Sequence, residues 1–253
     1  MKHTIKMIVT DLDGTLLRSD SSISEYTKAV FKRCQDFGIK IAYATGRGGG
    51  IEHVAPASLF DATVTSNGVT AQIGSELVYN RPIPYLAARP ILIACGERAL
   101  KCGAHTSDMH YAAFPLSDIW PSFKNFEVVD FSTFEHDVQK IWVYNATADD
   151  IAFINSQLSD ELYMVMAMDS YAMIMHKDAT KAKATAELAS VWGIAAHEIA
   201  AFGDDLNDVD MLSYAGVAVA MGNALPEVKA VSDHICLSND EDGLAKWLEE
   251  HIL

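Results

Sequence analysis

Two aspartates lie two residues apart near the start of the chain, in the stretch IVTDLDGTLL, directly after an apolar run. Carboxylates this close repel each other and lose hydration when buried, so a cation or a division of roles should accompany them. A carboxylate can attack phosphorus when a divalent cation neutralises the charge between the two anions, and a second carboxyl group can transfer protons. The pattern favours phosphoryl transfer, with Asp11 as nucleophile and Asp13 as general acid and base.

A second acidic run, GDDLNDVDML at residues 203–212, could complete a cation site. Mg²⁺ prefers carboxylates and other oxygen ligands, so Asp204 and Asp11 are the predicted side-chain ligands. Asp208 could orient Lys181 or a water bound to the ion. Several acids beside one apolar strand are costly to bury without a cation, so we expect Mg²⁺ as the cofactor.

Phosphoryl transfer also needs fixed donors around the outer phosphoryl oxygens. The candidates are the Thr45 hydroxyl, the backbone N–H groups of Leu12 and Gly46, the Lys181 ammonium group and the Asn207 amide. Each motif alone has a plainer explanation as an acidic turn, a strand-to-helix turn or a surface lysine. Their occurrence together, each at a predicted strand end or helix start, favours a single site.

These residues can act together only if the fold brings their segments to one place. Predicted strands at 4–10, 39–45 and 62–66 alternate with helix-like segments that end at Gly38 and Leu59. The same alternation returns after residue 180 and continues to the C-terminus. Strands alternating with helices indicate an α/β fold with a doubly wound parallel sheet, in which ligands bind beyond the carboxyl ends of the strands.

The residue pattern in the middle of the chain differs from the alternating strand and helix pattern at both ends. The proline-punctuated segment RPIPYLAARP opens it, and strand-like runs such as KIWVYNA lie among stretches of mixed character. We therefore expect an inserted α+β domain at residues 83–177, within a core formed by 1–82 and 178–253. Specificity for a substrate should reside in the insertion, where the candidates are His105, His110, Tyr111 and His176.

The composition excludes several classes of partner. A net charge of −15 and a pI near 4.8 oppose binding to nucleic acid or to an anionic membrane surface. The sequence shows no signal peptide and no apolar stretch that could span a bilayer, so we expect a cytoplasmic protein. The cysteines at 34, 95, 102 and 236 have neither CxxC pairing nor metal-ligand spacing. The oligomeric state stays open.

The chain resembles the haloacid dehalogenase (HAD) superfamily, in its Cof-type subfamily of cap-bearing phosphatases. The matching segments are DLDGTLL (11–17), ATGR (44–47), SNG (66–68), TK (180–181), GDDLNDVDML (203–212), AMGNALPEVKAVSDHI (220–235) and SNDEDGLAKWLEE (238–250). The resemblance implies a Rossmann-like core with an α/β cap, and an activity toward small phosphorylated metabolites such as sugar phosphates or phosphorylated cofactors. It also implies an aspartyl-phosphate at Asp11 and a Mg²⁺ ligand in the backbone carbonyl of Asp13.

By the same resemblance, Thr45 and Lys181 are the motif threonine and lysine, and Asp204 and Asp208 are the acids of the GDxxND motif. One departure is Ala182, where many relatives carry glycine after the motif lysine. The first prediction for the activity is therefore a phosphatase. A phosphomutase, which returns the phosphoryl group to its substrate, and a non-catalytic sugar-phosphate sensor are the alternatives.

Overall fold

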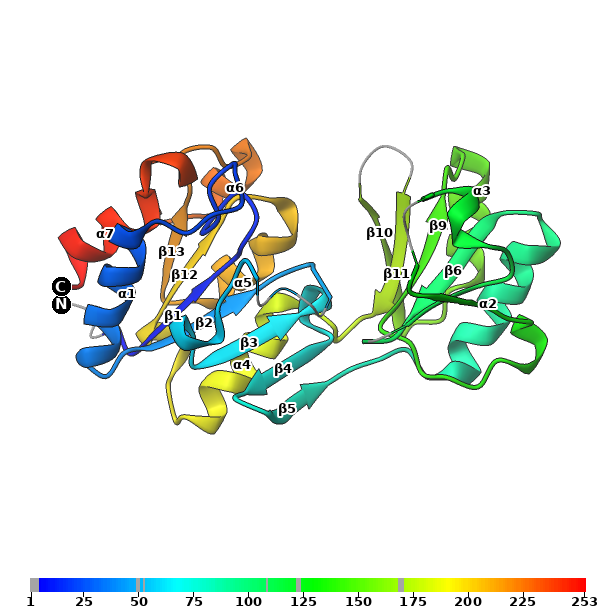
Figure 1. The fold of residues 1–253 in the computed structure, drawn as a ribbon, viewed down its shortest axis with the longest axis horizontal. Coiled ribbons are helices and arrows are strands. Elements are labelled where there is room, and N and C mark those ends of the chain that lie inside the picture. Colours follow the sequence, from blue (N-terminus) through cyan, green and yellow to red (C-terminus); the bar gives the residue numbers. More distant parts are fainter. Residues whose placement is uncertain (1–4, 49–50, 52, 108, 122–123, 168–170) are drawn as a thin grey trace. The chain divides into compact units, whose positions relative to one another are not determined.

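The computed structural model describes residues 5–48, 51, 53–107, 109–121, 124–167 and 171–253. The chain divides into two compact units (Figure 1). Unit 1 comprises Met1–Asn80 and Thr180–Leu253, and unit 2 comprises Arg81–Ala179. The role of the inserted segment as a cap that selects the substrate stays a prediction.

Unit 1 is built on an eight-stranded sheet with the strand order β14-β13-β12-β1-β2-β3-β4-β5. Neighbouring strands from β14 to β3 run parallel, and β4 and β5 add an antiparallel edge. The apolar residues of β1 are buried on both faces of this sheet, as is typical of a central parallel strand. The strands are β1 (Met7–Thr10), β2 (Lys40–Ala44), β3 (Ala62–Thr65), β4 (Thr70–Ile73), β5 (Glu76–Asn80), β12 (Ile199–Gly203), β13 (Val217–Ala220) and β14 (His234–Ile235).

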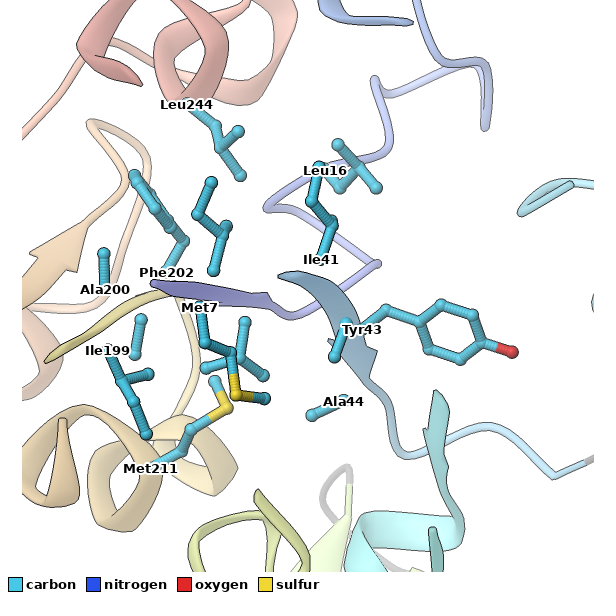
Figure 2. Packing of buried hydrophobic residues seen from close by; sticks show 14 of the residues in the cluster. Met7, Leu16, Ile41, Tyr43, Ala44, Ile199, Ala200, Phe202, Met211 and Leu244 are labelled. Carbon is cyan, nitrogen blue, oxygen red and sulfur yellow. The ribbon is translucent and has the colours of Figure 1, made fainter. Parts of the chain in front are cut away.

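Helices cover both faces of this sheet. Figure 2 shows Leu244 of α7 on one side of β1 and Met211 of α5 on the other, with Met7 and Phe202 in the core between the layers. The α/β fold with a doubly wound, mostly parallel sheet is therefore confirmed. The helices of unit 1 are α1 (Glu25–Asp36), α4 (Lys181–Val191), α5 (Val209–Tyr214), α6 (Pro226–Ala230) and α7 (Gly243–His251).

The predicted helix ending at Leu59 is wrong for the residues that the structure describes. Between β2 and β3 these residues form no α-helix, and only Ala57–Leu59 make a short 3₁₀ turn. The segment contains the run GRGGG and Pro56, and glycine and proline are the residues least favourable to a helix interior. The composition of this segment therefore accounts for the absence of the predicted helix among its described residues.

Unit 2 is an α+β unit with a six-stranded, mostly antiparallel sheet in the order β10-β11-β9-β6-β7-β8. Its two helices lie on one face of the sheet (Figure 1). The elements are α2 (Tyr85–Glu97), β6 (Lys101–His105), β7 (His110–Ala112), β8 (Phe126–Val128), β9 (Lys140–Tyr144), α3 (Ala148–Gln157), β10 (Leu162–Ala167) and β11 (Tyr171–His176). Within the described ranges, no helix combines the length and apolar character needed to cross a membrane.

Candidate active site

The candidate site lies at the carboxyl ends of β1, β2 and β12, where ligands bind in open α/β sheets. Thr10 of β1 pairs in register with Phe202 of β12 and Tyr43 of β2, so the residues that follow these strands emerge side by side. The backbone N–H of Asp11 donates to the carbonyl of Phe202 at 3.0 Å, which continues the ladder by one residue. Asp11 is thereby held at the strand end, with 6% of its surface exposed.

Lys181 joins two of the predicted acids. Its Nζ donates to Oδ1 of Asp11 and to Oδ1 of Asp208, each at 2.6 Å. Only 1% of Lys181 is exposed, and the burial of all three groups makes these contacts stronger than ion pairs on a surface. The arrangement fixes the Asp11 carboxylate in orientation and partly balances its charge.

The start of helix α4 positions this lysine. Thr180 caps the helix, since its hydroxyl accepts from the backbone N–H of Lys183, and Lys181 is the first helical residue. Gly68, in the turn after β3, packs against this cap. A Cβ at Gly68 would lie 2.1 Å from the Thr180 carbonyl oxygen, so only glycine permits the approach.

Charge and burial shift the pKa values of the site in opposite senses. Burial raises the pKa of Asp11 to about 7, with Lys181 acting against the shift and Asp208 and Asp204 adding to it. Burial acts to lower the pKa of Lys181, but Asp11 and Asp208 outweigh it and hold that pKa above its ordinary value. The amine is therefore a permanent cation, while the surrounding carboxylates are an unfavourable concentration of negative charge.

Asp204 completes an acidic cluster beside this lysine. Carboxylate oxygens of Asp11, Asp204 and Asp208 all lie within 4.8 Å of one another. Burial raises the pKa of Asp204 to about 6, although the Thr15 hydroxyl donates to its Oδ1 at 2.6 Å. Gly14 has φ +76°, and a Cβ there would lie 2.3 Å from Oδ2 of Asp204, so the turn after β1 closes tightly over this acid.

Asp208 has a supporting position in this cluster. Its Oδ2 accepts from the backbone N–H groups of Asp204 and Asp205, at 3.0 and 3.1 Å, and its Oδ1 accepts from Lys181. The side chain is fully buried. Because both oxygens already have donors, Asp208 shapes the loop and orients Lys181, and Asp11 and Asp204 are the better cation ligands.

The donor set of the cluster fits Mg²⁺. Asp11 and Asp204 offer carboxylate oxygens, the ligand type that Mg²⁺ prefers, from two loops of fixed geometry. Their raised pKa values mark a place where a divalent cation would relieve repulsion and desolvation. A Mg²⁺ ion held there would supply charge neutralisation between a carboxylate and a phosphoryl group.

Asp13 lies outside the carboxylate cluster. Arg47, which follows the predicted Thr45-Gly46 pair, donates from Nε and Nη2 to the two oxygens of Asp13, at 2.7 and 2.5 Å. About half of the Asp13 side chain is exposed. The carboxyl group is thus accessible and oriented by a two-point contact, which suits a proton-transfer group better than a cation ligand.

Two of the groups predicted to donate hydrogen bonds to the phosphoryl oxygens, Thr45 and Gly46, directly follow β2. Thr45 is fully buried, and its hydroxyl accepts from the Arg47 N–H at 3.1 Å. A Cβ at Gly46 would lie 2.8 Å from Oδ1 of Asn67. Asn67 has φ 58°, the left-handed region that asparagine tolerates, and its Oδ1 accepts from Nδ2 of Asn207 at 3.0 Å. Asn67 thereby links the β2 loop to the acidic loop after β12.

A sequence model of the haloacid dehalogenase-like hydrolases matches residues 8–248. The chain belongs to this family. Among known relatives, the 5-amino-6-(5-phospho-D-ribitylamino)uracil phosphatase YitU of Bacillus subtilis is 29% identical over 262 residues, which cover 97% of each chain. This HAD-type protein is thus an enzyme, and its class is that of the phosphatases.

Solved HAD structures share the fold over nearly the full chain. A HAD superfamily phosphatase from Bacteroides thetaiotaomicron superposes with a TM-score of 0.86 at 26% identity, covering 98% of this chain and 96% of the other. A HAD subclass IIB sugar phosphatase gives a TM-score of 0.82 at 25% identity, covering 97% and 98%. The likeness therefore includes both units of this hydrolase.

The structure brings most of the predicted site residues to the carboxyl ends of the parallel strands in this HAD core. Asp11, Asp204, Asp208 and Lys181 make direct contacts or lie within one cluster, and Leu12 follows Asp11 in the same buried turn. Thr45, Gly46 and Asn207 gather around Asn67, whereas the side chain of Asp13 turns to Arg47.

Sequence reasoning missed three residues that support this arrangement. Thr15, Arg47 and Asn67 each contact a predicted site residue through a side chain. All three belong to motifs that carried the family resemblance, DLDGTLL, ATGR and SNG. The signal was therefore present, but no local pattern assigns their partners, which lie 189, 34 and 140 residues away.

Proposed function

We propose that this hydrolase is a Mg²⁺-dependent phosphatase that cleaves small phosphorylated metabolites through an aspartyl-phosphate at Asp11. The observation that carries the proposal is the contact of Lys181 with Asp11 beside the carboxylate of Asp204. A buried nucleophile next to a fixed cation and a second acid matches the needs of phosphoryl transfer.

In the first half-reaction, an oxygen of Asp11 attacks phosphorus and the P–O bond to the alcohol breaks. Asp13 gives a proton to the leaving oxygen. In the second, water attacks the phosphorus of the aspartyl-phosphate, Asp13 takes its proton, and inorganic phosphate leaves with Asp11 restored. The two donors from Arg47 hold the Asp13 carboxyl group in a constant orientation.

Other residues of this chain would bind the phosphoryl oxygens. Lys181 contributes positive charge, and Thr45, Asn207 and the N–H groups of Leu12 and Gly46 are the proposed donors. Thr45 and Gly46 lie at the end of β2, and Asn207 belongs to the loop after β12, so these groups approach from two strand ends. Such fixed donors favour the transition state because they need no reorganisation during the reaction.

The proposed substrates are sugar phosphates and related phosphorylated metabolites. Two relatives support this class, since one is named for a phospho-D-ribitylamino compound and the other as a sugar phosphatase. We further propose that unit 2 selects among these substrates. Of the candidates there, His176 lies beside Glu161 and Asp178, and Tyr111 is buried in the core of the unit. A cytoplasmic location and the absence of nucleic-acid partners stay predictions.

The test is hydrolysis of an aryl phosphate by the full chain, with Mg²⁺ and after chelation, followed by a panel of phosphorylated metabolites ranked by kcat/KM. We expect turnover only with the divalent cation. Binding of phosphate esters without turnover under any divalent cation would contradict the proposal and favour a sensor. Transfer of the phosphoryl group back to a sugar in preference to water would favour a mutase.

A further inference from the structure

The sheet of unit 2 has one face packed on helices and an opposite face that carries polar side chains beside a smaller apolar cluster formed by Ala112, Leu116 and Trp142. Ala104, Ile141 and Val143 belong to the cluster packed against α2 and α3. Because side chains alternate along a strand, the neighbours of these residues on β6 and β9 point to the opposite face. This opposite face carries His105, Lys140 and Trp142.

Three basic residues form a continuous row on that face. His105 pairs in register with His110 of β7 and with Lys140 of β9, so the three side chains share one face of neighbouring strands. The rings of His105 and His110 stack with their centroids 4.9 Å apart. His105 and Lys140 are 7% and 8% exposed, so the row is largely removed from water. We call these three residues the basic row.

On this face of the sheet, a buried nitrogen of His105 and one of Trp142 have no hydrogen-bond partner within the described part of the chain. They are Nε2 of His105 and Nε1 of Trp142. A buried polar atom without a partner loses its hydration without compensation, so native proteins rarely leave one without a ligand or an ordered water. Trp142 lies two residues after Lys140 on the same strand and the same face, roughly 7 Å along it.

The surroundings of the basic row favour a negatively charged ligand. The titratable neighbours that act on His105 are Lys140 and His110, and after burial both lower its pKa further. Burial also lowers the pKa of Lys140 to about 8. Lysine and the indole N–H only donate hydrogen bonds, so their natural complement is an acceptor. An oxyanion would accept from the unpartnered indole N–H and balance the positive charge of Lys140.

The geometry points to an anion-binding site in unit 2, where Lys140, the indole N–H of Trp142 and His105 hold a small oxyanion, either a carboxylate or a phosphate group. The ring of Trp142 is fixed for this role, because it packs over Gly103 and stacks on Tyr171 with an interplanar angle of 11°. A Cβ at Gly103 would lie 2.3 Å from the indole ring. The site does not depend on the chemistry proposed for Asp11.

The experiment is NMR of the full chain with labelled histidine rings, with the His105 signals assigned from their loss in His105→Asn. Inorganic phosphate and acetate are titrated separately, at constant ionic strength against chloride. We expect saturable shifts of the His105 signals with one anion or both, and the tighter of the two identifies the ligand class. The pKa of His105 should rise by about one unit at saturation, because an opposite charge favours its protonated form.

Matched variants assign the donors. Lys140→Met should weaken anion binding at least tenfold, whereas Lys101→Met, which removes an exposed lysine from β6, should leave it unchanged. Trp142→Phe, which keeps an aromatic ring at this position but removes the second ring and the N–H, should weaken binding several-fold and serves if Lys140→Met does not fold. His105 signals that neither anion moves beyond the chloride control would overturn the proposal. Equal binding by the Lys140 and Lys101 variants would also overturn it.

Discussion

The guanidinium group of Arg47 holds the carboxylate of Asp13 through both of its oxygens, at 2.7 Å from Nε and 2.5 Å from Nη2. Asp13 follows β1 and Arg47 follows β2, two adjacent parallel strands. A two-point contact of this kind fixes the plane of the carboxyl group as well as its position. The contact links Asp13, the proposed acid and base, to the loop after β2. That loop carries Thr45 and Gly46, the proposed hydrogen-bond donors to the phosphoryl oxygens.

Arg47→Met should lower kcat on an aryl phosphate by roughly ten- to a hundredfold, because an unoriented acid or base loses part of the factor of about 10²–10⁴ that such a group contributes. Arg33→Met, which removes an exposed arginine that pairs with Glu249, is the control and should leave kcat unchanged. An Arg47 variant with the kcat of the parent protein would show that the contact has no part in catalysis.

Asp11→Asn should abolish turnover while the fold survives. The amide lacks the nucleophilic carboxylate, so the loss in kcat should reach on the order of 10⁴-fold or more. Lys181 keeps Asp208 as a partner in this variant, which favours a folded protein. Steady-state kinetics and circular dichroism test both points, with Asp36→Asn as a surface control. Measurable steady-state hydrolysis by the Asp11 variant would refute the covalent intermediate.

Lys181→Met should destabilise the folded chain. The substitution leaves the buried carboxylates of Asp11 and Asp208 without their shared cation, and such uncompensated charge costs about 3–5 kcal/mol. Urea denaturation at neutral pH measures the free energy of unfolding. Lys183→Met, one half-turn along the same helix and exposed, should change it by less than about 0.5 kcal/mol. Similar stabilities for the two variants would mean that the buried ion pairs contribute little.

The stability of the metal-free protein should fall as the pH rises from about 4 to about 7. The folded-state pKa values of Asp11 and Asp204 are raised to about 7 and about 6, from ordinary values of 3.8. In that window the folded chain therefore binds more protons than the unfolded chain, and the stabilisation present below pH 3.8 is lost as these groups ionise.

Mg²⁺ should reverse this loss, and more strongly at pH 8 than at pH 5, because it binds the ionised carboxylates. At a hundred times its Kd, a ligand of the folded state adds about 2.7 kcal/mol. Thermal unfolding with and without Mg²⁺ at the two pH values measures the effect, and Asp204→Asn should reduce it. If Mg²⁺ stabilised the parent protein equally at the two pH values, and stabilised the Asp204 variant as much as the parent, the cation would bind at a site other than this cluster.

The sequence alone predicted the fold class correctly, and it predicted that several of the candidate site residues would lie at neighbouring strand ends. Apolar runs ending in polar clusters predicted the strands β1, β2 and β12, and the rule that ligands bind beyond parallel strand ends predicted that Asp11, Thr45 and Asp204 would lie near one another. These inferences succeed because strand periodicity and strand-end chemistry are local properties of the chain. The prediction of a helix before Leu59 was wrong because the run GRGGG and Pro56 disfavour a helix in that segment.

Only the tertiary structure decided which side chains are partners. Lys181 donates to Asp11 across 170 residues of sequence, and Thr15 donates to Asp204 across 189. The order of strands in the sheet brings the members of each pair together in space. The same holds for the basic row of unit 2, where register places His105 between His110 and Lys140. Sequence spacing carries no information about such contacts, because their energy depends on burial and orientation that exist only in the packed fold.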